Sequence, residues 1–121
     1  MNEASIDSQK FAELLVTEFP ELRDDIQEWH DLVHLQMMEF RLLTTRACER
    51  GNWETVEKCL GLADGLLRLG DSEVKNAVSV SYLENLPRKG EIHDRLRTMM
   101  TADLNRGWDE ILAYLSKLLG T

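Results

Sequence analysis

The stretch Gly70–Leu86, GDSEVKNAVSVSYLENL, decides the fold that the sequence predicts. Gly70 follows an apolar run and is typical of a left-handed helix end, because glycine has no Cβ to clash there. Asp71 can cap a new helix, since its carboxylate accepts from the free N–H groups of the first turn. Pro87 opposes continuation because its ring and its missing N–H disrupt a helix. The sequence therefore predicts a helix from about residue 72 to residue 86.

This helix is apolar on most sides, which predicts that it is buried. On a helical wheel its apolar side chains fall all around: Val74, Ala77, Val78, Val80, Tyr82, Leu83 and Leu86. The alternation in Val-Ser-Val-Ser would also suit a strand. The length, the two marked ends and the helical neighbours favour the helix, and we expect the other helices to cover it.

Helical patterns also fill the part of the chain before this stretch. Residues 1 to 6 are expected to be flexible, and a first helix from Asp7 or Ser8 ends before Pro20. The segment 21–50 is either one long helix or two helices with a bend near His30 to His34. A helix over 53–69 then pairs with the central helix across a very short turn, as a helical hairpin.

The segment after Pro87 predicts a helix over about 91–104 and another over 108–119. A break at Asn105–Gly107 separates them, and a single helix through Asn105 is the alternative. The predicted fold is all-α: a compact bundle of about six helices with repeat-like hairpin pairing. We expect one all-helical domain over residues 1–121, because this length suits one core and is too short for two.

Charge and composition exclude several classes of function. The chain has 22 acidic and 14 basic residues and a net charge of −8, which disfavours nucleic acid and anionic lipid and favours a basic protein partner. No apolar segment approaches the roughly 18 residues that span a bilayer, and no signal peptide pattern is present. The expected location is the cytoplasm, where Cys48 and Cys59 would stay reduced.

Two histidines in His30-Asp31-Leu32-Val33-His34 form the candidate metal site. If this segment is helical, the two imidazoles lie four residues apart on one face and can chelate a metal. Zinc proteases use this spacing with a glutamate after the first histidine, whereas Asp31 is shorter and would place its carboxylate differently. Because no third ligand is evident, two solvated surface histidines are the alternative that the spacing favours.

Four further residues are candidates for an interaction site. Asn76 and Tyr82 are polar groups on the nominally buried helix, so they either find partners in the core or face a cleft. Asp24 and Asp25 place negative charge at a helix start, where the helix dipole stabilises it. They could also contact a basic partner.

No catalytic constellation is recognisable. Glycine-rich phosphate loops, nucleophile elbows and zinc-ribbon spacings are absent. Cys59 lies in an apolar stripe and is predicted to be a core residue, and a bland buried thiol is also the favoured interpretation of Cys48. We therefore predict that the chain is not an enzyme and needs no cofactor.

Two local signatures carry a resemblance to a known family. One is Phe19-Pro20-Glu21-Leu22, and the other is GDSEVKN at 70–76 leading to YLENL at 82–86. Together they resemble a family of small bacterial all-helical proteins of uncharacterised function, some of whose relatives are encoded near toxin systems. The resemblance implies an immunity or antitoxin-like role and supplies no catalytic residues.

The leading functional hypothesis is a non-enzymatic module that binds a basic protein through an acidic helical surface. A small metal-binding protein or metalloenzyme that uses His30 and His34 is one alternative. A structural homodimer is the other, with Met37, Met38 or an edge of Trp108 as its exposed contacts.

Overall fold

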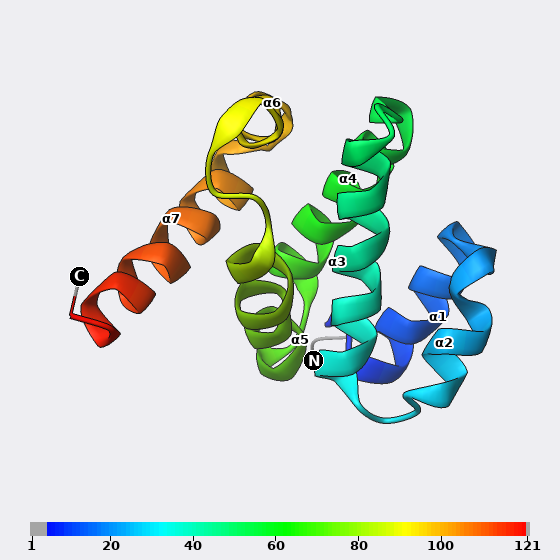
Figure 1. Cartoon of the computed structure of the whole chain (residues 1–121). Helices are drawn as coiled ribbons and strands as arrows, with labels where there is room; N and C mark the ends of the chain where they lie inside the picture. The colour runs from blue at the N-terminus through cyan, green and yellow to red at the C-terminus, as the bar shows by residue number, and fades with distance from the viewer. Residues whose placement is uncertain (1–4, 121) are drawn as a thin grey trace.

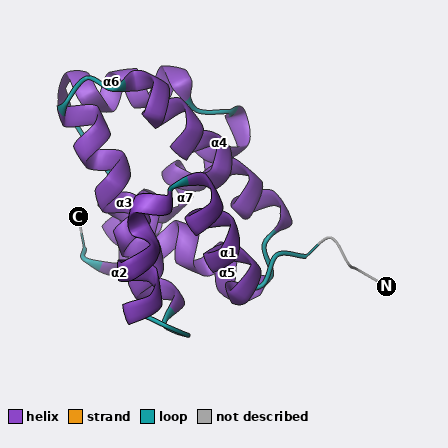
Figure 2. Cartoon of the chain, turned by 90° about the vertical axis from the view of Figure 1, so that its right-hand side faces the viewer, coloured by secondary structure: helices purple, strands orange, loops and turns teal. Residues whose placement is uncertain are grey.

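The computed structural model describes residues 5 to 120, and within this range the chain is helical with no strand. Figure 2 shows only helices and the loops that join them. The elements in chain order are α1 (Ser8–Glu18), η1 (Pro20–Leu22), α2 (Arg23–Glu28), α3 (Val33–Glu49), α4 (Trp53–Leu69), α5 (Ser72–Ala77), η2 (Val78–Tyr82), η3 (Leu83–Asn85), α6 (Gly90–Met99) and α7 (Ala102–Leu118). The predicted all-α bundle is confirmed.

The helices are arranged in sequence order across the molecule (Figure 1). α1 and α2 lie on one side, α3 and α4 stand in the middle, and α6 and α7 lie on the other side. The segment formed by α5, η2 and η3 packs against α3 and α4, and α7 covers η2 and η3. The predicted hairpin of 53–69 with the central helix is therefore present, as α4 followed by α5.

The central helix keeps its predicted position but changes its geometry along its length. It begins as an α-helix capped by Asp71, whose Oδ1 accepts from the Val74 N–H at 2.9 Å. It then widens into the π-helical segment η2 and tightens into the 3₁₀ turn η3. Its burial is less complete than predicted, because Asn76 is exposed and Val80 is 38 % exposed. The helix is buried on one broad face.

Tyr82 joins this helix to α3 in the middle of the core. Its ring stacks on Phe40 with 4.7 Å between centroids, and both side chains are fully buried. The Tyr82 hydroxyl lies 2.9 Å from Thr44 Oγ1, which in turn lies 3.1 Å from the Phe40 carbonyl. Because the Thr44 hydroxyl donates to that carbonyl, Tyr82 donates to Thr44. Tyr82 is thus a satisfied core residue and reaches no cleft.

Gly70 closes the helix before it for a reason other than the predicted one. Its φ of −68° and ψ of 154° are extended rather than left-handed. A Cβ built there would lie 2.5 Å from the Leu66 carbonyl oxygen and 2.8 Å from Val74 Cγ1, so the close approach requires glycine. Ile6 is held at the same place, since its N–H donates to the Leu69 carbonyl and its own carbonyl accepts from Asp71, both at 2.8 Å. The chain is therefore tied down at Ile6, within the stretch expected to be flexible, and residues 1 to 4 lie outside the described range.

The segment 21–50 contains two helices, with the bend near His30 that was one of the two predicted alternatives. α2 ends at Glu28 and α3 begins at Val33. Asp31 in this turn has a φ of 62°, a left-handed conformation that costs a non-glycine residue about 1 kcal/mol and that aspartate tolerates better than most. The turn reverses the direction of the chain so that α2 and α3 lie side by side.

The predicted break at Asn105–Gly107 is wrong, and so is a single helix from residue 91 through Asn105. The chain breaks at Met100 and Thr101, and α7 then runs unbroken to Leu118. Thr101 caps α7, because its Oγ1 accepts from the Leu104 N–H at 3.1 Å and donates to Asp64 Oδ1 at 2.7 Å. Gly107 lies inside the helix, where a Cβ would come within 3.0 Å of Leu67 on α4.

α6 and α7 are clamped together through Arg97. Its guanidinium lies 4.2 Å from the centroid of the Trp108 ring, forms an ion pair with Asp109 at 2.8 Å and donates to Asn105 Oδ1 at 3.0 Å. Trp108 itself is fully buried. This clamp holds the last two helices as one unit at the end of the molecule opposite α1 and α2 (Figure 1).

We predict opposite effects from one substitution at two glycines. Gly70→Ala should destabilise the protein by about 1 to 3 kcal/mol, because the new methyl group meets backbone and Val74. Gly61→Ala should stabilise it by about 0.5 to 1 kcal/mol, because nothing lies near that Cβ and alanine is the better helix former. Urea unfolding of both variants measures this difference. Equal stability changes would contradict the close packing at Gly70.

The buried hydroxyl pair generates a second prediction. Thr44→Val should cost about 1 to 3 kcal/mol, because it leaves the Tyr82 hydroxyl buried without an acceptor. Tyr82→Phe should cost only about 1 kcal/mol, because the Thr44 hydroxyl keeps its bond to the Phe40 carbonyl. Denaturant unfolding of the two variants gives the order. The reverse order would show that Tyr82 is not held in the core in this way.

Candidate functional site

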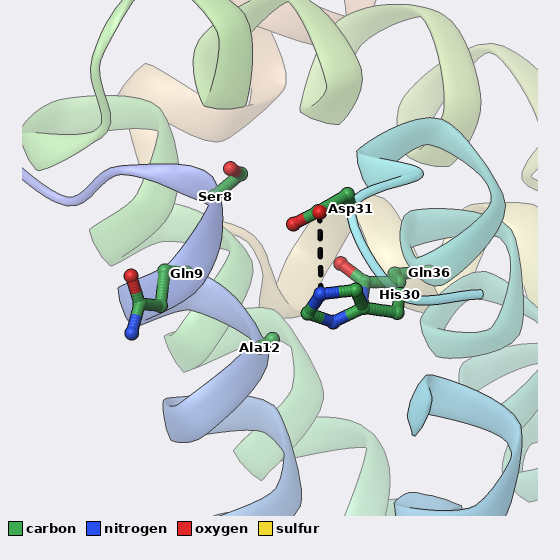
Figure 3. Close-up of a pocket in the computed structure, with 6 residues that line it drawn as sticks. All are labelled: Ser8, Gln9, Ala12, His30, Asp31 and Gln36. Atoms are coloured by element: carbon green, nitrogen blue, oxygen red, sulfur yellow. Dashed lines mark ion pairs between the residues drawn. The ribbon is translucent and has the colours of Figure 1, made fainter. Parts of the chain in front are cut away.

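A cavity of about 300 Å³ opens between the start of α1 and the turn that joins α2 to α3 (Figure 3). In Figure 3 the α1 residues lie on one side of this cavity and the residues of the turn and of α3 on the other. Its lining residues are Ser8, Gln9, Ala12, His30, Asp31 and Gln36. This end of the site is polar.

A second cavity of about 380 Å³ shares Ala12, His30 and Gln36 with the first and continues along α1 and α2. Its other lining residues are Glu13, Val16, Thr17, Ile26 and Gln27. The two cavities are neighbours along α1 and share three lining residues, and we call them together the α1–α2 groove. Ala12, Val16 and Ile26 give it an apolar floor.

Local packing sets the shape of this groove. Pro20 starts the tight turn η1, which folds α2 back toward α1. Gln36 is 4 % exposed and donates from Nε2 to the Ile26 carbonyl at 3.1 Å, which ties the middle of α2 to α3. Trp29 donates from Nε1 to Glu39 Oε2 at 3.1 Å and holds the end of α2. The walls are thus built by residues that are themselves fixed.

His30 and Asp31 stand at the mouth of the groove. His30 Nε2 lies 3.2 Å from Asp31 Oδ2, the contact drawn as a dashed line in Figure 3. Both side chains are more than four-fifths exposed, so water screens their attraction. The pair presents one nitrogen and one carboxylate at the surface.

His34 is not part of this pair, so the predicted shared helix face is wrong. His30 lies in the turn and His34 in the first turn of α3. His34 Nδ1 lies 2.6 Å from Ser81 Oγ, on the side of α3 that faces η2. Over residues 5 to 120, no group of three or more His, Cys, Asp or Glu side chains could hold a metal ion.

The acidic residues are concentrated in the segment of the chain that contains the groove, although only Glu13 and Asp31 line the groove itself. Residues 5 to 32 contain eight acidic and two basic side chains, a net charge of −6, whereas residues 33 to 120 contain thirteen and twelve, a net charge of −1. All eight acidic residues are exposed: Asp7, Glu13, Glu18, Glu21, Asp24, Asp25, Glu28 and Asp31. We call this part of the molecule, α1 to the turn before α3, the acidic lobe.

The predicted interaction residues are distributed over three places. Asp24 and Asp25 are exposed in the first turn of α2, within the acidic lobe. Asp25 lines a neighbouring cavity together with Arg46 and Arg50. Asn76 is exposed on α5 and is not among the groove residues, and Tyr82 is in the core.

Sequence reasoning did not identify the groove residues of α1. Ala12 and Val16 look like ordinary members of an amphipathic helix, and only the fold of α2 makes them a floor. The uneven distribution of charge along the chain was a signal that could have pointed to the lobe.

The two thiols do not offer nucleophilic chemistry. Cys48 and Cys59 are free and buried, as predicted. Burial raises the pKa of Cys59 to about 11 and also raises the pKa of Cys48. Because the thiolate is the reactive form, both groups stay neutral and unreactive near pH 7.

The homodimer hypothesis placed its contacts at residues that the structure buries. Met37 and Trp108 are fully buried, and Met38 is half-buried. The large apolar side chains that are exposed are Leu32, Leu69, Val80, Tyr114, Leu118 and Leu119. Across the described helices, none is both long and apolar enough to cross a membrane.

Comparison with known proteins identifies a family but no characterised relative. A family model described as a domain of unknown function, DUF7674, matches residues 12–116. No curated protein and no solved structure matches significantly. The match covers most of the chain, from the middle of α1 to near the end of α7, so the chain belongs to the DUF7674 family.

Proposed function

We propose that this chain is a non-enzymatic protein-binding module whose acidic lobe docks a basic partner. The observation that carries the proposal is the charge distribution. Residues 5 to 32 hold a net charge of −6 out of −8, and all of their acidic side chains are exposed. An exposed surface of one charge sign on a small protein steers a partner of the opposite charge toward it and orients that partner.

The acidic lobe neutralises little of its own charge. Its two ion pairs among residues 5 to 32 join Lys10 to Glu13 at 4.0 Å and His30 to Asp31. The first is at the limit of contact, and the second carries charge on the histidine only when the imidazole is protonated. By contrast, Arg68, Arg97 and Arg106 in the rest of the molecule each pair with a carboxylate at 3.2 Å or less. The lobe therefore keeps most of its negative potential for a partner.

The biological setting that we propose is an immunity or antitoxin-like role in a bacterial cytoplasm. The support is the resemblance of Phe19–Leu22 and Gly70–Leu86 to a family of small bacterial proteins, some of whose relatives are encoded near toxin systems. In such a role the module would block a basic toxin by covering its working surface. Electrostatic steering would speed the encounter, and the rigid helical core would present the lobe without rearrangement.

Neutralising the lobe tests this proposal. Asp24→Asn/Asp25→Asn/Glu28→Gln removes three negative charges from the lobe, and Glu49→Gln/Glu57→Gln/Glu110→Gln removes three exposed ones elsewhere. Cross-linking with mass spectrometry in the native cell identifies the partner, and calorimetry of the purified pair measures affinity. We expect at least a tenfold loss for the lobe variant and less than a threefold loss for the matched control, because the lobe faces the partner.

Two results would contradict the proposal. One is a partner that binds both variants equally well. The other is a partner whose affinity does not fall between 50 and 300 mM salt, because an exposed electrostatic contact is screened at that ionic strength.

Metal binding is a second candidate, and the contact of His30 with Asp31 favours it. Imidazole nitrogen and carboxylate oxygen are both zinc ligands, and here they lie side by side at a cavity mouth. If this pair binds zinc, His30→Ala should abolish the zinc retained by untagged protein, and His34→Ala should not, since His34 lies at Ser81. Elemental analysis after dialysis measures it. Zinc-free wild-type protein would exclude this function.

A further inference from the structure

The acidic lobe holds a groove as well as a charged surface, and the two features together specify what it can accept. The floor is apolar, with Ala12 and Val16 on α1 and Ile26 on α2. Glu13 and Asp31 line it as well, at 59 % and 83 % side-chain exposure. An apolar floor with an acidic rim matches a ligand with an apolar stripe and flanking positive charges.

The dimensions suit a short helix. The groove follows α1 from Ser8 to Thr17, ten residues that rise about 15 Å, or close to three helical turns. Ala12 in the middle of the floor has a small side chain, which lets another backbone come close. An extended peptide usually adds to a free strand edge, and the chain forms no strand between residues 5 and 120. Helix-in-groove recognition is the mode that an apolar groove between two helices suits.

We propose that the α1–α2 groove is the docking site for a lysine- or arginine-rich amphipathic helix of a partner protein. The proposal rests on the proposed function and adds the partner's secondary structure and its place on the lobe. The partner helix lays small and medium apolar side chains at i, i+3 and i+4 on Ala12, Val16 and Ile26. Its basic side chains reach Glu13 on one wall and Asp31 at the other.

A second copy of this chain fits the groove less well. The segment before and within α6 holds four basic side chains, which are Arg88, Lys89, Arg95 and Arg97. Arg95 already lies over the Trp53 ring at 4.3 Å, and Arg97 is held by Trp108 and Asp109. Arg95 and Arg97 thus serve the fold, so a foreign basic helix is the better occupant.

The test uses two synthetic peptides of identical composition, made of leucine, alanine and lysine. One arranges the apolar residues on a single helical face, and the other scrambles them so that no face forms. We expect the amphipathic peptide to bind the full chain at least tenfold more tightly than the scrambled one, by fluorescence anisotropy. When this peptide binds, the amide chemical shifts of the protein should change at residues 8–17 and 26–36.

Variants of the chain locate the contact. Ala12→Gln fills the floor without changing charge, and Ala113→Gln makes the same change at an exposed site on α7. Ala12→Gln should weaken the amphipathic peptide at least tenfold, and Ala113→Gln less than twofold. Glu13→Gln/Asp31→Asn removes two rim charges and leaves the floor open, so it should weaken binding and flatten its dependence on salt. Thermal unfolding confirms that each variant is folded.

Three outcomes would contradict the proposal that a basic helix docks in the groove. Equal binding of both peptides, with no effect of Ala12→Gln, would show that charge alone attracts them, which refutes the groove and leaves the acidic-lobe proposal standing. Shift changes confined to the exposed end of α7 would place the contact elsewhere. Self-association that excludes the peptide would make a second copy the occupant. The acidic-lobe proposal fails separately, if the charge-neutralised triple variant keeps its cellular partner.

Discussion

The stacking of Tyr82 on Phe40, locked by the hydroxyl pair with Thr44, is the contact on which the rest of the structure depends. It joins the central helical segment to α3 at full burial. α4 and α7 then pack on the same segment, and α1 and α2 pack on α3, with α1 also in contact with α5. Burial raises the pKa of Tyr82 well above its ordinary value, so the hydroxyl remains neutral and hydrogen-bonded. Removing the Tyr82 ring would leave a cavity between the central segment and α3.

Much of the fold could be predicted because the residues that start and end its helices act locally. Asp71 caps its helix as expected. Asn52 caps α4 in the same way, directly after Gly51 with its left-handed φ of 70°. The predictions were wrong at positions where tertiary packing determines the local structure. Gly107 resembles a helix break in sequence but lies inside α7, where it packs close to the Leu67 side chain of α4. No sequence pattern marks the π-helical turn at Val78–Tyr82, since the same residues suit a regular helix or a strand.

The candidate site was harder to predict, because it is made by the meeting of two helices. Asp24 and Asp25 belong to it through charge, whereas Ala12 and Val16 become a floor only when α2 folds back. The prediction that both imidazoles lie on one helix face was wrong because it requires an unbroken helix. A turn at Asp31 instead separates His30 from His34, which lies in the first turn of α3. The central core of this DUF7674 chain and the acidic lobe, to which we assign the proposed function, are thus separate parts of the molecule.

Hydrogen–deuterium exchange of the full chain, with and without the amphipathic lysine-rich peptide, tests this division most directly. Our account predicts the slowest exchange in residues 72–85 and no change there when the peptide binds. Added protection should appear in residues 8–30, where the groove and the acidic lobe lie. Rapid exchange in 72–85 would contradict the central role of that helix. Protection that appears in residues 102–118 instead of 8–30 would contradict the acidic lobe as the binding surface.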